Sequence, residues 1–159
     1  MDLLIVIDLQ KAFINKNTFH LESKIESLLN ENKYKNVIFT RFVNTEDSIF
    51  VNKLNYRECI TEDSKQIVIN TGNDFVIDKN GYSVLTNQLK EYIDVNNINN
   101  IYLCGIDTEC CVLKSALDLF EAGYNVYVLK DYCASFYGVI RHENALEILK
   151  SNIGKNYVI

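Results

Sequence analysis

The stretch Ile101-Tyr102-Leu103-Cys104-Gly105-Ile106 decides the expected fold, because it is largely apolar and shows no polar alternation. Such a run is typical of a strand buried on both faces, as in a parallel sheet. The segment 112–122 follows with apolar residues at helical spacing, and Gly123 stands where a C-cap glycine belongs. A strand followed by a helix is the repeating unit of an α/β domain.

The same alternation extends along the rest of the chain. Further apolar runs predict strands at 3–7, 37–40, 67–69 and 126–129, with 157–159 as a short edge strand. Helical spacing predicts helices over 21–32, 85–95 and 140–149. We therefore expect a three-layer αβα fold, a Rossmann-like open sheet of about five to six mainly parallel strands with helices on both faces.

The composition is that of a single globular domain, which we expect to span residues 1–159. Hydrophobic residues make up 48% of the chain and charged residues 23%, a balance that supports a packed core. The net charge is −5 and the basic residues are scattered, so we expect no nucleic-acid partner. No apolar run approaches the roughly 18 to 20 residues of a membrane span, so we expect no membrane partner.

The cysteines indicate a reducing environment. There are five of them, Cys59, Cys104, Cys110, Cys111 and Cys133. The first residues resemble a strand and not a signal peptide, so this odd number predicts free thiols and a cytoplasmic location. No C-x-x-C pair occurs, and His20 and His142 are the only histidines, so the spacing of a zinc site is absent.

Candidate catalytic residues follow the predicted strands, at the sheet edge where open α/β folds bind ligands. Asp8 follows the first run, Lys79 lies beyond the third, and Cys111 stands where the fourth run gives way to a helix. Cysteine reacts as its thiolate, which a helix N-terminus and a lysine stabilise. Asp8 can accept the thiol proton and pass it to a leaving amine. The pattern predicts Cys111 as nucleophile, Asp8 as base and Lys79 as charge partner.

Other interpretations stay open at this point. Taken singly, Asp8 fits a turn cap, Lys79 a solvated surface lysine and Cys111 a packed core thiol. Asp8 also fits a phosphoryl-accepting nucleophile, although that chemistry usually uses magnesium and a second acid at the position of Gln10. A third interpretation is a non-catalytic binding module or oligomeric scaffold.

Four segments, in this order, resemble the isochorismatase-like family of cysteine hydrolases, also called nicotinamidase-related amidases. They are V-I-D-L-Q-K-A-F at 6–13, K-N-G-Y-S at 79–83, G-I-D-T-E-C-C-V at 105–112 and D-Y-C-A-S at 131–135. In the family's nucleophile motif the cysteine directly precedes the valine. The resemblance therefore selects Cys111, next to Val112, over Cys110.

The resemblance implies a mechanism for hydrolysis of a small amide-type substrate. Asp8 deprotonates Cys111, Lys79 completes the triad, and the thiolate attacks the carbonyl to form a thioester that water hydrolyses. The backbone N–H groups of Asp107 and Cys111 are implied as the oxyanion hole, and the Ile106–Asp107 peptide as cis. The resemblance also implies a homo-oligomer, a dimer or larger.

Two departures from the family pattern bear on this expectation: a metal-binding cluster is missing, and the chain is short between the first two strands, where a loop often shapes the pocket. Nicotinamidases of the family carry a metal-binding aspartate and histidine cluster after the second strand, whereas the segment 40–47 has no histidine. We therefore predict no metal and no cofactor. Isochorismatases usually lack the nucleophilic cysteine, so the presence of Cys111 favours amide hydrolysis over the vinyl-ether cleavage of an isochorismatase. A nicotinamidase or an isochorismatase proper remains the alternative.

Aromatic residues near the strand ends predict the substrate pocket. The expected lining residues are Phe13, Phe42, Tyr82 and Tyr137, with Phe136 as a further rim candidate. Core packing is the alternative role for some of them. His142, in the first turn of the last helix, is expected to be structural.

Overall fold

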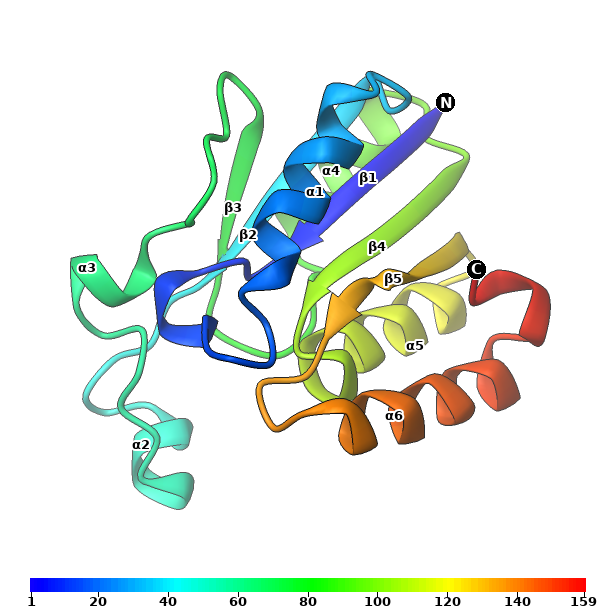
Figure 1. Cartoon of the computed structure of the whole chain (residues 1–159). Helices are drawn as coiled ribbons and strands as arrows, with labels where there is room; N and C mark the ends of the chain where they lie inside the picture. The colour runs from blue at the N-terminus through cyan, green and yellow to red at the C-terminus, as the bar shows by residue number, and fades with distance from the viewer.

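The computed structural model describes residues 1–159 and contains one open sheet of five parallel strands (Figure 1). The strands are β1 (Asp2–Ile7), β2 (Asn36–Phe42), β3 (Phe75–Lys79), β4 (Asn100–Ile106) and β5 (Asn125–Ala134). Their order across the sheet is β3-β2-β1-β4-β5, and every neighbouring pair is parallel. The predicted α/β fold is confirmed.

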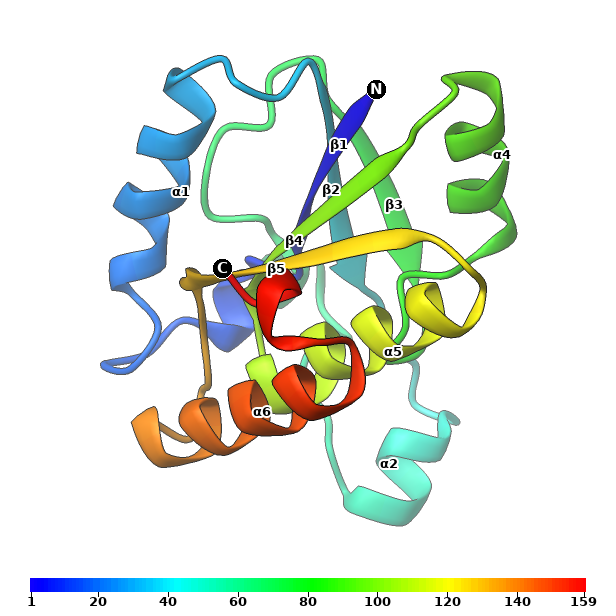
Figure 2. The same cartoon turned by 90° about the vertical axis from the view of Figure 1, so that its right-hand side faces the viewer.

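Helices cover both faces of this sheet. They are α1 (His20–Asn30), α2 (Ile49–Leu54), α3 (Glu62–Lys65), α4 (Asn87–Val95), α5 (Leu113–Glu121) and α6 (Val139–Asn152), with short helices η1 (Lys11–Phe13), η2 (Thr108–Val112) and η3 (Lys155–Tyr157). Figure 2 shows α1 on one face of the sheet and α4 and α5 on the other. Helix α6 packs against α5 and β5. The four longest helices lie where apolar spacing predicted them.

The core explains why the central strands could be predicted. Residues Leu3 to Ile7 of β1 are completely buried, and most of β4 is buried as well. Helices contribute one apolar stripe each, which in α1 consists of Leu21, Ile25 and Leu28. Burial on both faces accounts for the unbroken apolar runs in these strands.

Two predicted strands are corrected by the structure. The run 67–69 is not a strand: Ile67 makes one isolated antiparallel bridge to Gln10, and the third strand of the sheet is β3. Strand β3 lies at the sheet edge, where Phe75 and Asp78 are exposed, so it lacks a continuous apolar run. The run 157–159 contributes only one bridge, between Val158 and Val128.

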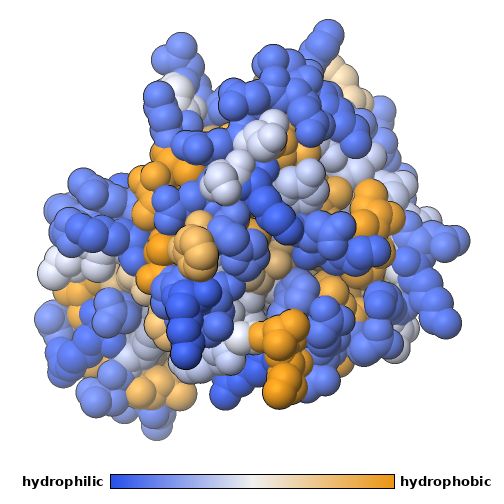
Figure 3. All heavy atoms as spheres, viewed as in Figure 1, coloured by the Kyte–Doolittle hydropathy of each residue, from blue (hydrophilic) through white to orange (hydrophobic).

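The surface is mainly polar. Figure 3 shows one face on which hydrophobic side chains form small groups separated by hydrophilic ones. None of the helices has both the length and the apolar character needed to span a membrane.

Candidate active site

A glycine brings the ends of β1 and β4 together. Gly105 pairs with Ile7 across the two strands and has a φ of +119°. A Cβ at Gly105 would lie 2.1 Å from the carbonyl oxygen of Ile7, so only glycine fits here. This close approach places Asp8, which follows β1, beside the segment that leads from β4 to Cys111.

Asp8, Lys79 and Cys111 meet at this edge of the sheet. The Nζ atom of Lys79 lies 2.6 Å from Oδ2 of Asp8 and 3.6 Å from Sγ of Cys111. Asp8 is 0% exposed, Lys79 4% and Cys111 8%. Asp8 follows β1, Lys79 ends β3, and Cys111 lies in η2 beyond β4. The structure therefore brings together the three residues that the sequence singled out.

Further contacts orient the carboxylate and the ammonium group. The hydroxyl of Thr40 donates to Oδ1 of Asp8 at 2.7 Å and accepts from the backbone N–H of Asp8 at 3.3 Å. Lys79 donates to the carbonyl oxygen of Gly81 at 2.9 Å, and its Nζ lies 5.6 Å from the ring centroid of Phe42. Sequence reasoning missed Thr40, because a single threonine in a strand carries no signal of its own.

Gln10 has a structural role beside this group. Its side chain donates to the carbonyl oxygens of Phe42 at 3.0 Å and Lys65 at 3.1 Å, and it accepts from the backbone N–H of Phe42 at 2.7 Å. Gln10 is fully buried. It therefore ties the end of β1 to the end of β2 at the position where a phosphoryl-transfer site usually has its second acid.

The charges of the three residues are strongly coupled. Burial raises the pKa of the Cys111 thiol well above its usual value, the Asp8 carboxylate raises it further, and the Lys79 ammonium opposes both effects. Burial by itself lowers the pKa of Lys79, but the neighbouring Asp8 and Cys111 outweigh it, so the net pKa is raised. Lys79 is therefore a cation at neutral pH, and Cys111 is a thiol until a base takes its proton.

Cys111 lies on a tight turn. The Ile106–Asp107 peptide is cis, as the resemblance implied. Helix η2 is a single π-helical turn in which the backbone N–H of Val112 donates to the carbonyl oxygen of Asp107 at 3.1 Å. The hydroxyl of Ser115 donates to the carbonyl oxygen of Cys111 at 2.5 Å. This turn carries the backbone N–H groups of Asp107 and Cys111, the pair expected to bind an oxyanion.

A small apolar cavity, which we call the Cys111 pocket, opens above the thiol. Its volume is about 140 Å³. The lining residues are Phe13, Phe42, Phe50, Leu54, Tyr56, Tyr82, Asp107, Cys110, Cys111 and Tyr137. All four aromatic residues expected to line the pocket do so. Sequence reasoning missed Phe50, Leu54 and Tyr56, which belong to α2 and the segment after it.

Aromatic packing holds α2 over this pocket. The Phe50 ring lies edge-on to Phe42, at 5.0 Å between centroids, and edge-on to Tyr82, at 5.2 Å. Helix α2 has only six residues, too few to show the apolar spacing that identifies a longer helix. Phe136, the further rim candidate, lines a neighbouring cavity of about 360 Å³ and not the Cys111 pocket.

Asp107 is the only carboxylate in the lining of the Cys111 pocket. Its Oδ1 accepts from the backbone N–H of Phe136 at 2.6 Å. Burial raises the pKa of Asp107 to about 7, with the Phe136 hydrogen bond opposing the shift and the charges of Glu109 and Asp8 adding to it. Because Asp107 also lines the neighbouring cavity, this carboxyl stands where the two cavities adjoin.

The donor set does not suit a metal ion. No three side chains of histidine, cysteine, aspartate or glutamate lie close enough together to hold one. In the segment 40–47, the Asn44 amide donates to the carbonyl oxygens of Tyr56 and Glu58 and thus orders the chain.

Known proteins share both the sequence pattern and the fold. Isochorismatase domain-containing protein 2 of Xenopus laevis is 40% identical over 58 residues, which cover 36% of this chain and 28% of that protein's length. The pyrazinamidase/nicotinamidase of Streptococcus mutans UA159 superposes with a TM-score of 0.84 at 21% identity, covering 100% of both chains. The pyrazinamidase of Pyrococcus horikoshii, solved in complex with zinc, superposes with a TM-score of 0.82 at 24% identity, covering 95% of both chains.

The structural likenesses establish the fold, and the family follows from the sequence itself. A model of the isochorismatase domain matches residues 2–156, which include every strand and every site residue described above. This chain therefore belongs to the isochorismatase family.

Proposed function

We propose that this chain is a cysteine hydrolase that cleaves a C–N bond of a small amide-type substrate through a thioester. The observation that carries the proposal is the contact of Lys79 with both Asp8 and Cys111; all three are buried, and Cys111 lines an apolar pocket. A cysteine beside an acid–base group and a cation is the arrangement that nucleophilic catalysis needs.

The first half of the reaction forms the thioester. Asp8 takes the proton of Cys111 as the sulfur attacks the substrate carbonyl carbon, and Lys79 stabilises the negative charge on sulfur. The carbonyl oxygen becomes an oxyanion, to which the backbone N–H groups of Asp107 and Cys111 donate. The intermediate then collapses: the C–N bond breaks, and the proton held by Asp8 passes to the departing nitrogen. Ammonia or an amine leaves.

The second half restores the enzyme. Water attacks the thioester carbonyl while Asp8 accepts one of its protons. The C–S bond breaks, the carboxylic acid product leaves, and the sulfur of Cys111 regains the proton from Asp8. The proton transfers use Asp8 and Cys111, which both contact Lys79, and no metal takes part.

The Cys111 pocket limits the substrate to a small and mostly neutral molecule. Aromatic and aliphatic side chains form almost all of its lining, and an anionic group inside it would be desolvated without a cationic partner. Lys79 does not supply that partner, because it is already paired with Asp8. A hydrogen-bond donor on the substrate can meet Asp107, the one carboxylate in the lining.

The test is ammonia release from a panel of small neutral amides, including nicotinamide and pyrazinamide because two structural relatives carry those activities in their names. We expect at least one amide to be hydrolysed and mass spectrometry to detect an acyl group on Cys111. Cys111→Ala should abolish both signals. Cys104→Ala removes a buried thiol outside the pocket and serves as the matched control.

Two results would contradict the proposal. One is an amide that Cys111→Ala hydrolyses at the wild-type rate. The other is magnesium-dependent phosphatase activity that Asp8→Asn removes, with no amide hydrolysed, since this result favours phosphoryl transfer. If neither the wild type nor any variant hydrolyses a substrate, although all of them bind the same ligands, the chain is a binding module.

A further inference from the structure

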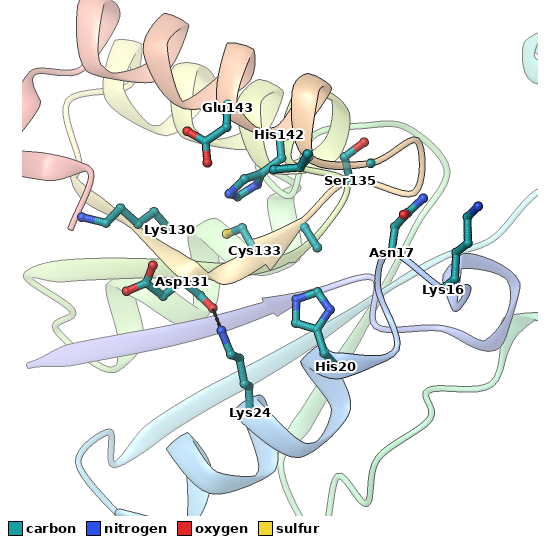
Figure 4. Close-up of a pocket in the computed structure, with 13 residues that line it drawn as sticks. Lys16, Asn17, His20, Lys24, Lys130, Asp131, Cys133, Ser135, His142 and Glu143 are labelled. Atoms are coloured by element: carbon teal, nitrogen blue, oxygen red, sulfur yellow. Dashed lines mark hydrogen bonds between the residues drawn. The ribbon is translucent and has the colours of Figure 1, made fainter.

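A third cavity, larger than the two described above, lies away from Cys111, between α1, β5 and the start of α6 (Figure 4). We call it the basic pocket. Its volume is about 430 Å³, and it shares no lining residue with the Cys111 pocket. The amide chemistry proposed above makes no use of it.

Cations gather in the basic pocket although the chain as a whole is acidic, with a net charge of −5. Lys16, Lys24 and Lys130 line it, against the two carboxylates Asp131 and Glu143. None of these five side chains forms an ion pair. The three ammonium groups thus lack a counter-charge in contact with them.

Both histidines of the chain also line this pocket. His20 projects from α1 and His142 from α6 toward the strand between them (Figure 4). Nδ1 of His142 lies 2.8 Å from the hydroxyl of Thr108, so Nε2 is the ring nitrogen left for another partner. Burial lowers the pKa of both rings: Lys24 lowers that of His20 further, and at His142 burial outweighs the nearby carboxylates Glu143, Glu109 and Asp131, which raise the pKa. Both are therefore mainly neutral at pH 7 and gain charge as the pH falls.

The backbone at the start of α6 adds hydrogen-bond donors to the basic pocket. Gly138 and Val139 line the pocket, and the first turn of this 14-residue helix has neither an acidic residue nor a side-chain cap. Lys24 uses one donor on the backbone carbonyl of Asp131, at 3.1 Å, and keeps its others (Figure 4). Donors thus reach the cavity from α1, from β5 and from α6.

We propose that the basic pocket binds a small oxyanion of the phosphate type, either free or carried on a small organic molecule. A tetrahedral oxyanion accepts hydrogen bonds from several directions, which matches donors on three separate elements. A carboxylate is planar and is matched best by the fork of an arginine, and no arginine lines this pocket. Lysine binds phosphate as a point charge.

The histidines give a direct readout, because the chain has only two and both lie at the site. We would titrate the intact protein with sulfate, whose charge is constant between pH 5.5 and pH 7.5, and follow both imidazole rings by NMR. Ring signals are assigned with His20→Gln and His142→Gln. Chloride at matched ionic strength is the reference. We expect saturable shifts of both rings with sulfate and binding about five- to tenfold tighter at pH 5.5 than at pH 7.5.

Lysine variants test the cations independently of the histidines. Lys24→Gln/Lys130→Gln should weaken sulfate binding at least about tenfold. The control Lys35→Gln/Lys90→Gln makes the same charge change at exposed positions outside the pocket and should bind as the wild type does. Circular dichroism checks that each variant is folded. The proposal is wrong if sulfate moves the rings no more than chloride does, or if both double variants bind sulfate equally well.

A comparison of inorganic phosphate with phenyl phosphate then shows whether the basic pocket prefers a free oxyanion or one carried on a small organic molecule. Equal affinity indicates the free anion, and tighter binding of phenyl phosphate indicates a phosphate carried on an organic molecule. If neither compound binds, the proposal fails. Because the readout needs no turnover, it stands or falls independently of amide hydrolysis at Cys111.

Discussion

The contact of one ammonium group with a carboxylate and a thiol determines what the site can do. Placing an unpaired charge in a protein interior is costly, and Lys79 and Asp8 offset part of that cost by pairing at 2.6 Å. In the proposed first step the proton of Cys111 moves to Asp8, so the negative charge passes from oxygen to sulfur and the net charge of the three residues is unchanged. Lys79 contacts both atoms, so it stabilises the charge before and after the transfer.

The role of Lys79 can be tested by Lys79→Met. Without the cation 3.6 Å away, the thiolate of Cys111 is less stable, so its alkylation by iodoacetamide at pH 8 should slow at least about tenfold. Peptide mass spectrometry measures the rate at Cys111 alone. Lys11→Met, which removes a lysine from an exposed ion pair with Asp63, is the control and should react as the wild type does. Equal rates in both variants would show that Lys79 does not support the thiolate.

The raised pKa of Asp107 predicts that the stability of the folded chain depends on pH. Its pKa is about 7 in the folded chain against an ordinary 3.8, so between these values the folded chain holds a proton that the unfolded chain has released. The contribution of this carboxyl to stability therefore falls as the pH rises from about 4 to about 7 and stays low above that. Asparagine can keep the hydrogen bond from Phe136 and carries no charge.

Asp107→Asn should therefore be more stable than the wild type at pH 8, by roughly 1 to 4 kcal/mol. The gain should shrink as the pH falls from about 7 toward 4 and vanish only well below the ordinary pKa of 3.8, where aspartic acid is neutral in both the folded and the unfolded chain. Urea unfolding of both proteins at pH 4.5 and pH 8 measures the difference. A gain that is the same at both pH values would rule out titration of Asp107 as its cause.

At the scale of elements, the sequence predicted what lies at the ends of long buried strands. Asp8 and Cys111 follow β1 and β4, whose unbroken apolar runs are readable because both faces of the sheet are covered. Edge strand β3 alternates between buried and exposed residues, so the third strand was misplaced at 67–69, and Lys79 was predicted only as a residue beyond that run. Thr40 contacts Asp8, and α2 lines the Cys111 pocket, through tertiary packing, which leaves no periodic pattern in the sequence.

The junction of β1 and β4 gives a prediction about stability. Gly105→Ala places a Cβ 2.1 Å from the Ile7 carbonyl oxygen, on a backbone with a φ of +119°, so the strands must part. We expect the free energy of unfolding to fall by at least about 3 kcal/mol. Gly81→Ala is the matched control, because a Cβ there meets nothing within 4 Å. Chemical denaturation compares the two, and similar stabilities would mean that β1 and β4 need no close approach.

At the scale of the whole molecule, the charge of the lining distinguishes the Cys111 pocket from the basic pocket. Aromatic side chains and one carboxylate line the Cys111 pocket, whereas lysines and histidines gather in the basic pocket. His142 joins the two regions through its contact with Thr108, three positions before Cys111 in the chain. The molecule thus has one cavity suited to neutral molecules and another suited to anions.

This division predicts how Cys111 discriminates between reagents of equal size. Iodoacetate carries a carboxylate that must enter an apolar cavity beside Asp107 with no cationic side chain in its lining, whereas iodoacetamide is neutral. The ratio of iodoacetamide to iodoacetate rates at Cys111 should exceed that of a small free thiol by about tenfold or more at pH 8. Asp107→Asn should move the ratio part of the way toward the free thiol, since it removes the like charge and keeps the apolar wall. If Cys111 and the free thiol show the same ratio, the pocket does not exclude anions, and the restriction to neutral substrates is wrong.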